Sequence, residues 1–335
     1  MRPLFAAFIL AIVPSGLLSA QNQETGGPQI HGTVRAKYEY QPQISSGRFE
    51  VRNARISLDG KCTPIVSYKA EIDLSDEGSI KMLDAYARLS PLSSTAVTLG
   101  QMRVPFTIDA HRSPHQQYFA NRSFIAKQVG NIRDVGLTLA WHSDKGLPVQ
   151  LEGGAFNGSG LTNQKNYWTS DINYSAKVQL SLLRNTRLVL SLQKAKPDQT
   201  RIHLYDIGAY WHTQRWHVEA EYLFKHYARN AFADVHAVDV FICHDIPLRR
   251  AFRKISLLGR FDYMSNHSDG TSDENGLLSL TDAARKRITG GITLSLSRPF
   301  LSDIRLNFEK YIYRHDAPVK VSEQDKIVLE FMTRF

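Results

Sequence analysis

Apolar and charged side chains alternate along the end of the chain, residues 326–335. Ile327, Leu329, Phe331 and Phe335 share one parity, and Lys326, Glu330 and Arg334 share the other. A strand with one apolar and one charged face suits a barrel wall, because lipid covers its outer side and a polar lumen its inner side. The terminal Phe335 is expected to anchor the strand that closes such a barrel. The edge strand of a soluble sandwich alternates equally well, so the rest of the chain has to decide.

The same alternation recurs in segments of strand length throughout the chain. We predict strands at 30–40, 49–61, 65–74, 82–89, 96–102, 133–142, 149–156, 171–183, 186–194, 203–213, 216–224, 234–244, 254–263, 287–297, 302–313 and 326–335. So many long strands disfavour a soluble sandwich, and their even number is typical of single-chain bacterial barrels. The predicted fold class is all-β, a transmembrane antiparallel β-barrel of about 16 strands. Segment 234–244 is an exception, because its apolar residues fall on both parities.

Long and short connections tend to alternate between the predicted strands. Long segments at 103–132, 157–170 and 264–286 fall at one end of the barrel, and tight turns at 184–185 and 214–215 fall at the other. Long outer loops and short inner turns are typical of bacterial outer-membrane barrels. The inner connection 245–253 is longer than this scheme requires. Arg285 is expected to be exposed in the last long loop.

The amino-terminal end predicts export. Arg2 precedes an apolar run at 4–13, and small residues at 18–20 offer a cleavage site. We therefore predict a signal peptide at residues 1–20 and an outer-membrane β-barrel at 21–335, placed in the bacterial outer membrane. The apolar run is too short to span a bilayer as a helix. Segment 21–29 is too short for a plug domain, which disfavours an energy-coupled receptor.

The chain carries a formal net charge of +9. A basic exported protein favours anionic partners, either small inorganic anions or the head groups of outer-membrane lipid and lipopolysaccharide. Nucleic acid is disfavoured, because the cations are spread along the chain without a helix or finger to present them. No cofactor or metal is predicted. His111 and His115 have helical spacing, but no further metal ligand is identifiable near them.

An enzyme is also disfavoured. Asp234 with His236, or His244 with Asp245, offers a pair of catalytic residue types. However, no set of Ser, His and acid can be placed at one rim of the barrel. Isolated histidines in a polar barrel are more often wall residues than catalytic ones.

Several motifs stand in order along the early strands. They are GRFEVRNAR at 47–55, SYKAEIDL at 67–74, DAY at 84–86, GQMRVPF at 100–106 and RDVG at 133–136. In sequence and spacing they resemble the phosphate-selective porin O and P family, whereas the later strands match only in style. The resemblance implies a homotrimeric porin whose third outer loop folds into the lumen. It also implies a pore that passes anions along a ladder of arginines.

The residues that we predict to form the anion path are Arg35, Arg55, Lys69, Arg103, Arg112, Arg122, Lys127 and Arg133. The last five lie between 103 and 133, where Asp109 is the only acid. A planar guanidinium donates two parallel hydrogen bonds to an oxyanion, so arginines in a constriction favour anions. If this segment lies outside the pore, its cations meet lipopolysaccharide phosphates instead. Acids of lumen parity, such as Glu71 and Asp84, neutralise part of the charge.

The predicted function is that of an outer-membrane porin, a diffusion channel that prefers anions, with phosphate or polyphosphate as candidate solutes. Two alternatives stay open. One is a general porin without selectivity, and the other is a scaffold or adhesion barrel without transport activity. Ion conductance in planar bilayers separates a porin from a scaffold.

Overall fold

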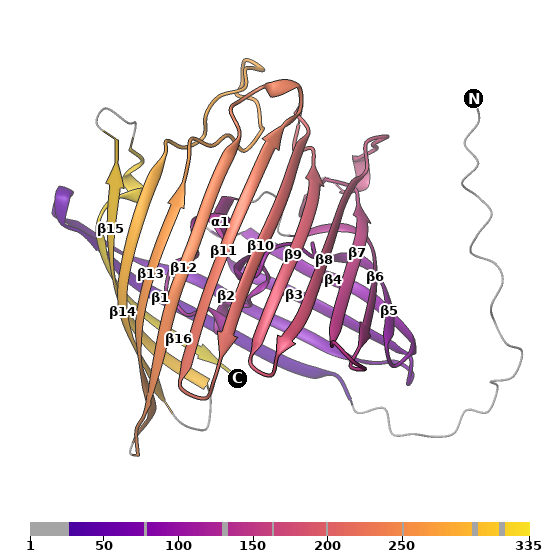
Figure 1. The fold of residues 1–335 in the computed structure, drawn as a ribbon, viewed down its shortest axis with the longest axis horizontal. Coiled ribbons are helices and arrows are strands. Elements are labelled where there is room, and N and C mark those ends of the chain that lie inside the picture. Colours follow the sequence, from indigo (N-terminus) through magenta and orange to yellow (C-terminus); the bar gives the residue numbers. More distant parts are fainter. Residues whose placement is uncertain are drawn as a thin grey trace, which may run out of the picture.

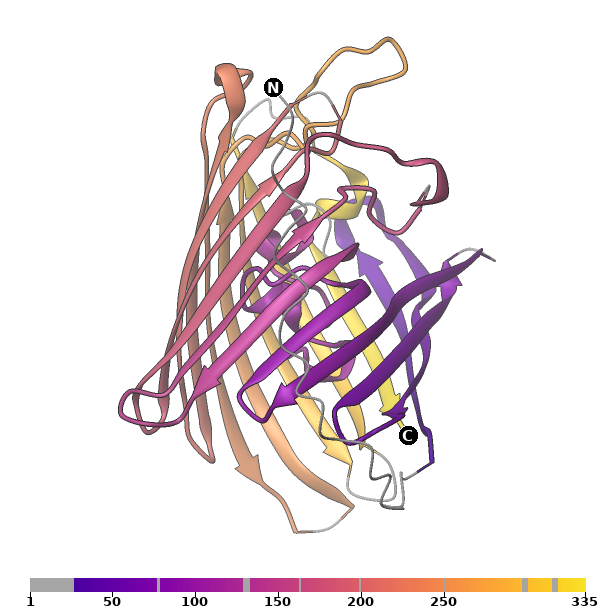
Figure 2. The same ribbon diagram turned by 90° about the vertical axis from the view of Figure 1, so that its right-hand side faces the viewer.

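The computed structural model describes residues 27–76, 79–128, 133–162, 164–198, 200–249, 251–296, 301–314 and 319–335. The predicted signal peptide at 1–20 lies outside these residues. Within them, the strands close into one antiparallel barrel, in which each strand pairs with the next and β1 pairs with β16 (Figure 1, Figure 2). The predicted fold class is therefore confirmed. A search of the described helices finds none with the length and apolar character that a membrane crossing requires.

The predicted strands match the observed ones to within three residues at every end. The strands are β1 (Gln29–Gln41), β2 (Ser46–Lys61), β3 (Val66–Asp76), β4 (Ser79–Leu92), β5 (Thr95–Arg103), β6 (Arg133–Ser143), β7 (Val149–Phe156), β8 (Asn173–Leu183), β9 (Thr186–Ala195), β10 (Ile202–His212), β11 (Trp216–Tyr227), β12 (Val235–Pro247), β13 (Phe252–Met264), β14 (Arg285–Leu296), β15 (Leu301–Tyr313) and β16 (Lys326–Arg334). The helices are η1 (Pro42–Ile44), η2 (Asp109–His111), η3 (Pro114–Gln116), α1 (Phe124–Gln128), η4 (Gln164–Asn166), η5 (Ala228–Asn230) and η6 (Val321–Glu323). Because β12 runs on to Pro247, the turn after it is shorter than the predicted connection 245–253.

Alternation places apolar side chains outside the barrel and polar ones inside it. On β8, Tyr174 and Leu182 are exposed, whereas Asn173 and Ser175 are buried. Successive side chains of a strand point to opposite faces, so the buried set faces the lumen. The predicted faces of β8 are therefore correct.

The barrel closes on the last residue of the chain. The Gly32 amide donates to the carbonyl oxygen of Phe335 at 2.8 Å, and the Phe335 amide donates back to the carbonyl oxygen of Gly32 at 3.1 Å. A β-carbon at position 32 would lie 2.2 Å from the Phe335 ring. The glycine lets the aromatic ring pack directly over the backbone of β1, and a larger residue there would displace the ring.

The mixed pattern that we noted at 234–244 has a physical cause on β12. Its buried, inward-facing apolar residues are Val235, Ala237, Phe241 and Cys243. They are covered by segment 104–128, the connection between β5 and β6. For example, the Phe119 and Phe241 rings meet edge to face, with their centroids 5.6 Å apart. Both faces of β12 are therefore apolar because one meets lipid and the other meets this segment.

On β8, a charged side chain is predicted to destabilise the barrel at an outward-facing position but not at an inward-facing one. Val178 lies midway along the strand, opposite the exposed Leu151 and Leu190 on the neighbouring strands. We expect Val178→Lys to lower the free energy of unfolding by about 2–4 kcal/mol, as for lysine at a bilayer midplane. The control Gln179→Lys, on the lumen face, should change it by no more than about 0.5 kcal/mol. Denaturant titration in lipid vesicles measures both, and equal losses would contradict the assigned faces.

Closure of the barrel through Phe335 predicts that this residue is needed for assembly. Deletion of Phe335 removes both backbone hydrogen bonds to Gly32 and the ring that covers it. We expect a reduced yield of heat-modifiable barrel in the outer membrane, whereas Phe335→Tyr, which keeps an aromatic ring, should assemble normally. A normal yield from the shortened chain would show that the closing strand does not need its terminal residue.

Candidate pore constriction

Segment 104–128 is held in place by an apolar cluster. Phe106, Phe124 and Ile125 are at most 3% exposed, and they pack with the inward-facing Leu223 and Met264 of the wall. The helix α1 within the segment is too short to be stable without such packing. In both ribbon views the part of the chain around α1 lies within the outline of the barrel (Figure 1, Figure 2).

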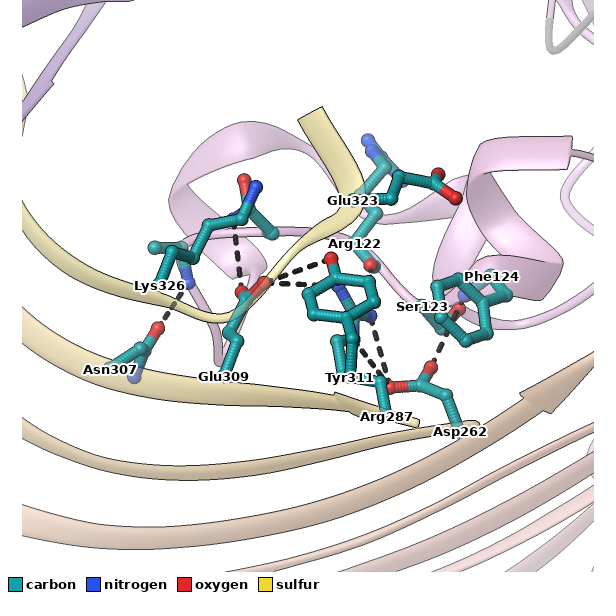
Figure 3. Close-up of polar contacts among 12 residues, drawn as sticks. Arg122, Ser123, Phe124, Asp262, Arg287, Asn307, Glu309, Tyr311, Glu323 and Lys326 are labelled. Carbon is teal, nitrogen blue, oxygen red and sulfur yellow. Dashed lines mark hydrogen bonds and ion pairs between the residues drawn. The ribbon is translucent and has the colours of Figure 1, made fainter. Parts of the chain in front are cut away.

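Polar side chains of the wall satisfy the backbone of this segment. On β15, the Asn307 Oδ1 accepts from the Ala120 amide at 2.7 Å. On β13, Asp262 accepts from the Phe124 amide at 3.2 Å, and both contacts are drawn in Figure 3. Buried backbone amides outside helices and strands need such partners. The sequence of the wall is thus matched to the course of the segment.

The segment also contacts the other parts of the wall. Arg35 on β1 donates to Gln117 Oε1 at 2.6 Å and to the carbonyl oxygen of Ala120 at 2.7 Å. On β9, the Ser191 hydroxyl accepts from the Thr107 amide at 3.0 Å. β1 and β9 lie half a turn apart in the strand order of the closed barrel. The segment therefore reaches inward-facing residues on opposite sides.

Three of the predicted wall cations lie in one ion-pair network. Its members are Arg55, Lys69, Arg133, Glu71, Asp73 and Asp84. Arg55 lies 3.0 Å from Asp73, and Arg133 lies 2.7 Å from Asp84. Lys69 lies 2.9 Å from the same Asp84. Because cations and carboxylates are equal in number here, the network carries little net charge.

Arg112 and Lys127 are also paired. Arg112 binds both carboxylate oxygens of the buried Glu219 on β11, one of them at 2.8 Å, and lies 3.4 Å from Asp109. Lys127 lies 2.6 Å from Glu323, and its side chain is 50% exposed. Both positions were predicted to lie on the anion path, and in the structure Arg112 fastens the segment to the wall.

Arg103 and Arg122 differ from the other predicted cations. Within the described parts of the chain, neither has a carboxylate within 4.0 Å. Arg103 donates to the carbonyl oxygen of His111 at 2.5 Å and to the Ser113 hydroxyl at 3.3 Å. Arg122 donates to carbonyl oxygens of the segment, among them that of Asp109 at 2.7 Å. Such acceptors orient a guanidinium without neutralising it, so these two of the predicted cations carry unbalanced positive charge.

Arg122 lies close to other arginines. Its pKa is lowered to about 10, first by burial and then, against the opposite effect of Asp109, by the charges of Arg55, Arg35 and Arg52. The guanidinium is still charged at neutral pH. β1, β2 and segment 104–128 thus bring positive charges together at one place in the barrel.

Both histidines of the segment are neutral. Burial, followed by the charges of Lys177 and Arg103, holds the pKa of His111 well below its usual value. Burial and then Arg334 lower the pKa of His115 to about 4. Arg334 donates to His115 Nε2 at 2.7 Å, a bond that only the neutral ring can accept. Among the described residues, no three metal-ligating side chains come together.

Sequence reasoning missed the arginines at the start of β14. Arg287 donates to Asp262 at 3.0 Å and to the carbonyl oxygen of Arg122 at 2.7 Å (Figure 3). The expectation that Arg285 is exposed was wrong: it is 1% exposed and lies 2.6 Å from Glu323. If the predicted strand 287–297 is extended by two residues toward its start, Arg285 and Arg287 both fall on the inward-facing parity. The alternation in the sequence was therefore sufficient to place both arginines inside the barrel.

Several solved structures share this fold. The anion-selective porin from Comamonas acidovorans has a TM-score of 0.63 and 12% identity, covering 92% of this chain and 98% of that chain. The outer-membrane channel DcaP of Acinetobacter baumannii has a TM-score of 0.63 and 14% identity, covering 92% and 97%. The trimer form of OmpT from Vibrio cholerae has a TM-score of 0.62 and 9% identity, covering 93% and 99%. At these identities the likeness shows the fold, which is that of an outer-membrane porin.

The family model of the phosphate-selective porin O and P matches residues 25–176. The resemblance predicted from the motifs is therefore confirmed for this part of the chain. Comparison with curated protein sequences gives no match. The matched family consists of porins, and one of the matched structures is a porin, so the prediction that the chain is not an enzyme is also confirmed. A β-barrel porin implies the bacterial outer membrane as its location.

The contact between Arg112 and Glu219 predicts a large cost of mutation. We expect Arg112→Gln to lower the free energy of unfolding by about 3–5 kcal/mol, because it leaves a buried carboxylate without its partner. The control Lys127→Gln breaks a half-exposed pair and should cost no more than about 1 kcal/mol. Denaturant titration of the two variants tests this, and losses of the same size would show that Arg112 does not anchor the segment.

Proposed function

We propose that the chain is a diffusion channel that prefers anions, and that segment 104–128 forms the constriction of its pore. The observation that supports this most is the unbalanced charge of Arg103 and Arg122, close to arginines of β1 and β2. A cation between low-dielectric walls attracts anions more strongly than it would in open water. The residues of the path then divide into two groups with different roles.

The paired cations supply hydrogen-bond donors along the path, and the unpaired ones set its potential. Arg55 and Arg133 share their carboxylates with neighbours, so an oxyanion has to compete for their guanidinium groups. Arginine suits this exchange, because its fork binds carboxylate and phosphate in the same geometry. Phosphate or polyphosphate is the candidate solute. The matched family is described as phosphate-selective and one structural relative as anion-selective, which supports this choice.

We further propose that the chain forms a homotrimer surrounded by outer-membrane lipid and lipopolysaccharide. OmpT of Vibrio cholerae has a trimer form. In this chain, the outer face of β1, β2 and β16 carries the exposed Ile30, Phe49 and Phe331. An apolar hollow of about 440 Å³ lies on the same face. Such a face needs cover from lipid or from a second copy.

Reversal potentials in planar bilayers with a salt gradient test the anion preference. We expect the double variant Arg103→Gln/Arg122→Gln to lower the anion-to-cation permeability ratio at least about thirtyfold, since one charge at ~8 Å and an effective dielectric constant of ~20 contributes ~2 kcal/mol. In the same double variant, added phosphate should block the chloride current less strongly. Lys127→Gln is the matched control, because Lys127 lies in the same segment but is paired and half exposed.

Three outcomes separate the alternatives. An unchanged reversal potential in the double variant would overturn the assignment of the constriction. A parent channel without ion preference would indicate a general porin. A barrel without any conductance would indicate a scaffold.

A further inference from the structure

A cavity of about 690 Å³ lies on the β4 to β8 side of the barrel. Its wall includes the cations Arg88 on β4 and Lys177 on β8, and His111 of segment 104–128. It also includes the amides Gln150 and Gln179 and the acids Asp144 and Glu152. Its volume falls within the range of roughly 300–1,000 Å³ that is usual for small-molecule sites. It is much larger than one inorganic anion requires.

Two cations in this cavity have no carboxylate within 4.0 Å in the described parts of the chain. Arg88 donates through Nε to the Thr98 hydroxyl at 3.0 Å, and its guanidinium lies 5.3 Å from the centre of the Tyr86 ring. No described residue occupies its two terminal nitrogens. Lys177 donates to the carbonyl oxygen of Thr107 at 2.6 Å. The cavity therefore holds two charges that a bound anion can neutralise.

Two carboxylates line the same cavity, and neither Asp144 nor Glu152 has an ion pair within 4.0 Å among the described residues. Glu152 and Lys177 are register partners on neighbouring strands, yet the ammonium group turns to Thr107 and makes no ion pair with Glu152 within 4.0 Å. No hydrogen bond to the Glu152 carboxylate meets the distance and angle limits among the described residues, and the nearby Thr138 hydroxyl donates to Met102 Sδ at 3.6 Å. Each carboxylate accepts several hydrogen bonds, so Glu152 has acceptor capacity left for a ligand.

The amides beside Glu152 add neutral donors and acceptors. Gln179 donates to Gln150 at 3.4 Å, a long bond between two side chains that line the cavity. A bare inorganic anion gains from Arg88 and Lys177 but is repelled by Glu152. A ligand that carries a negative group at one end and hydroxyls along the rest can bind to Arg88, Lys177 and Glu152 together. Its negative group binds to the two cations, and its hydroxyls donate to the carboxylate and the amides.

We infer that this cavity binds hydroxylated organic anions, the chemistry that sugar acids and sugar phosphates share. The negative group of the solute is bound by Arg88 and Lys177, and its hydroxyls by Glu152, Gln150 and Gln179. This inference rests on the proposed function, since it makes the cavity a second station for solutes in an anion-preferring pore. It names a class of solute larger than phosphate.

Block of the chloride current in planar bilayers tests the inference on the full chain. Gluconate and hexanoate serve as probes, because both are six-carbon acids and only gluconate carries hydroxyls. We expect gluconate to block at a concentration at least about tenfold lower than hexanoate, the effect of a hydrogen bond to a charged group. Glucose 6-phosphate, compared with inorganic phosphate, tests the same preference for a phosphorylated solute.

Variants assign the effect to the cavity. Glu152→Ala should raise the half-blocking concentration of gluconate about tenfold and leave that of hexanoate unchanged or lower. Arg88→Gln should weaken the block by both acids. The control Arg187→Gln removes a lumen cation of β9 that bonds only to the carbonyl oxygens of Leu183 and Thr186, and it should change neither. Heat modifiability verifies that each variant forms a barrel, and Glu152→Gln replaces Glu152→Ala if the latter does not fold.

The outcomes keep the two proposals apart. Equal block by gluconate and hexanoate, or a gluconate block that is insensitive to both Glu152 variants, overturns the cavity assignment even if reversal potentials show anion preference. A pore without anion preference overturns the proposed function. If gluconate still blocks that pore through Glu152, the cavity assignment stands.

Discussion

Pairing between β1 and β16 is the constraint on which the rest of the structure depends. Inside a bilayer a strand has no water to satisfy its backbone, so a sheet is stable there only when it has no free edge. Closure also fixes the register of every strand. A slip of one residue would turn each inward charge toward lipid. The backbone hydrogen bonds between β1 and β16 therefore help to set the positions of the pore residues, although most of those residues lie far from this strand pair.

The second determinant is the division of the inward charges into paired and unpaired groups. Burial makes an isolated charge costly, and most cations of the lumen lie beside carboxylates. Segment 104–128 uses such pairs, together with apolar packing on β12, to stay at one place inside the barrel. Arg103 and Arg122 are then held by neutral oxygens, which leaves their charge available. A rigid frame of neutralised pairs thus presents a small number of effective charges.

Strand number, boundaries and faces could all be predicted, because alternation depends only on which side of the wall a residue meets. The pattern failed on β12, where Phe241 faces inward but meets Phe119 and not water. The role of Arg112 could not be predicted either. Its partner Glu219 is 107 residues away in sequence, so no local pattern reveals that its charge is neutralised. Alternation assigns a side chain to a face, but the partner within that face depends on tertiary packing.

The contacts of β16 have a consequence for the order of assembly. Glu330 on this strand accepts from Arg35 at 2.9 Å, and Arg334 donates to His115 of segment 104–128 at 2.7 Å. Because β16 follows all the other strands of the barrel in the chain, both ties can form only after those strands have been synthesised. The strand that seals the wall against lipid is thus also the one that completes the support of the inner segment. A partly inserted barrel lacks both. With the proposed role of segment 104–128, sealing the membrane and restricting its permeability then occur in one step of biogenesis.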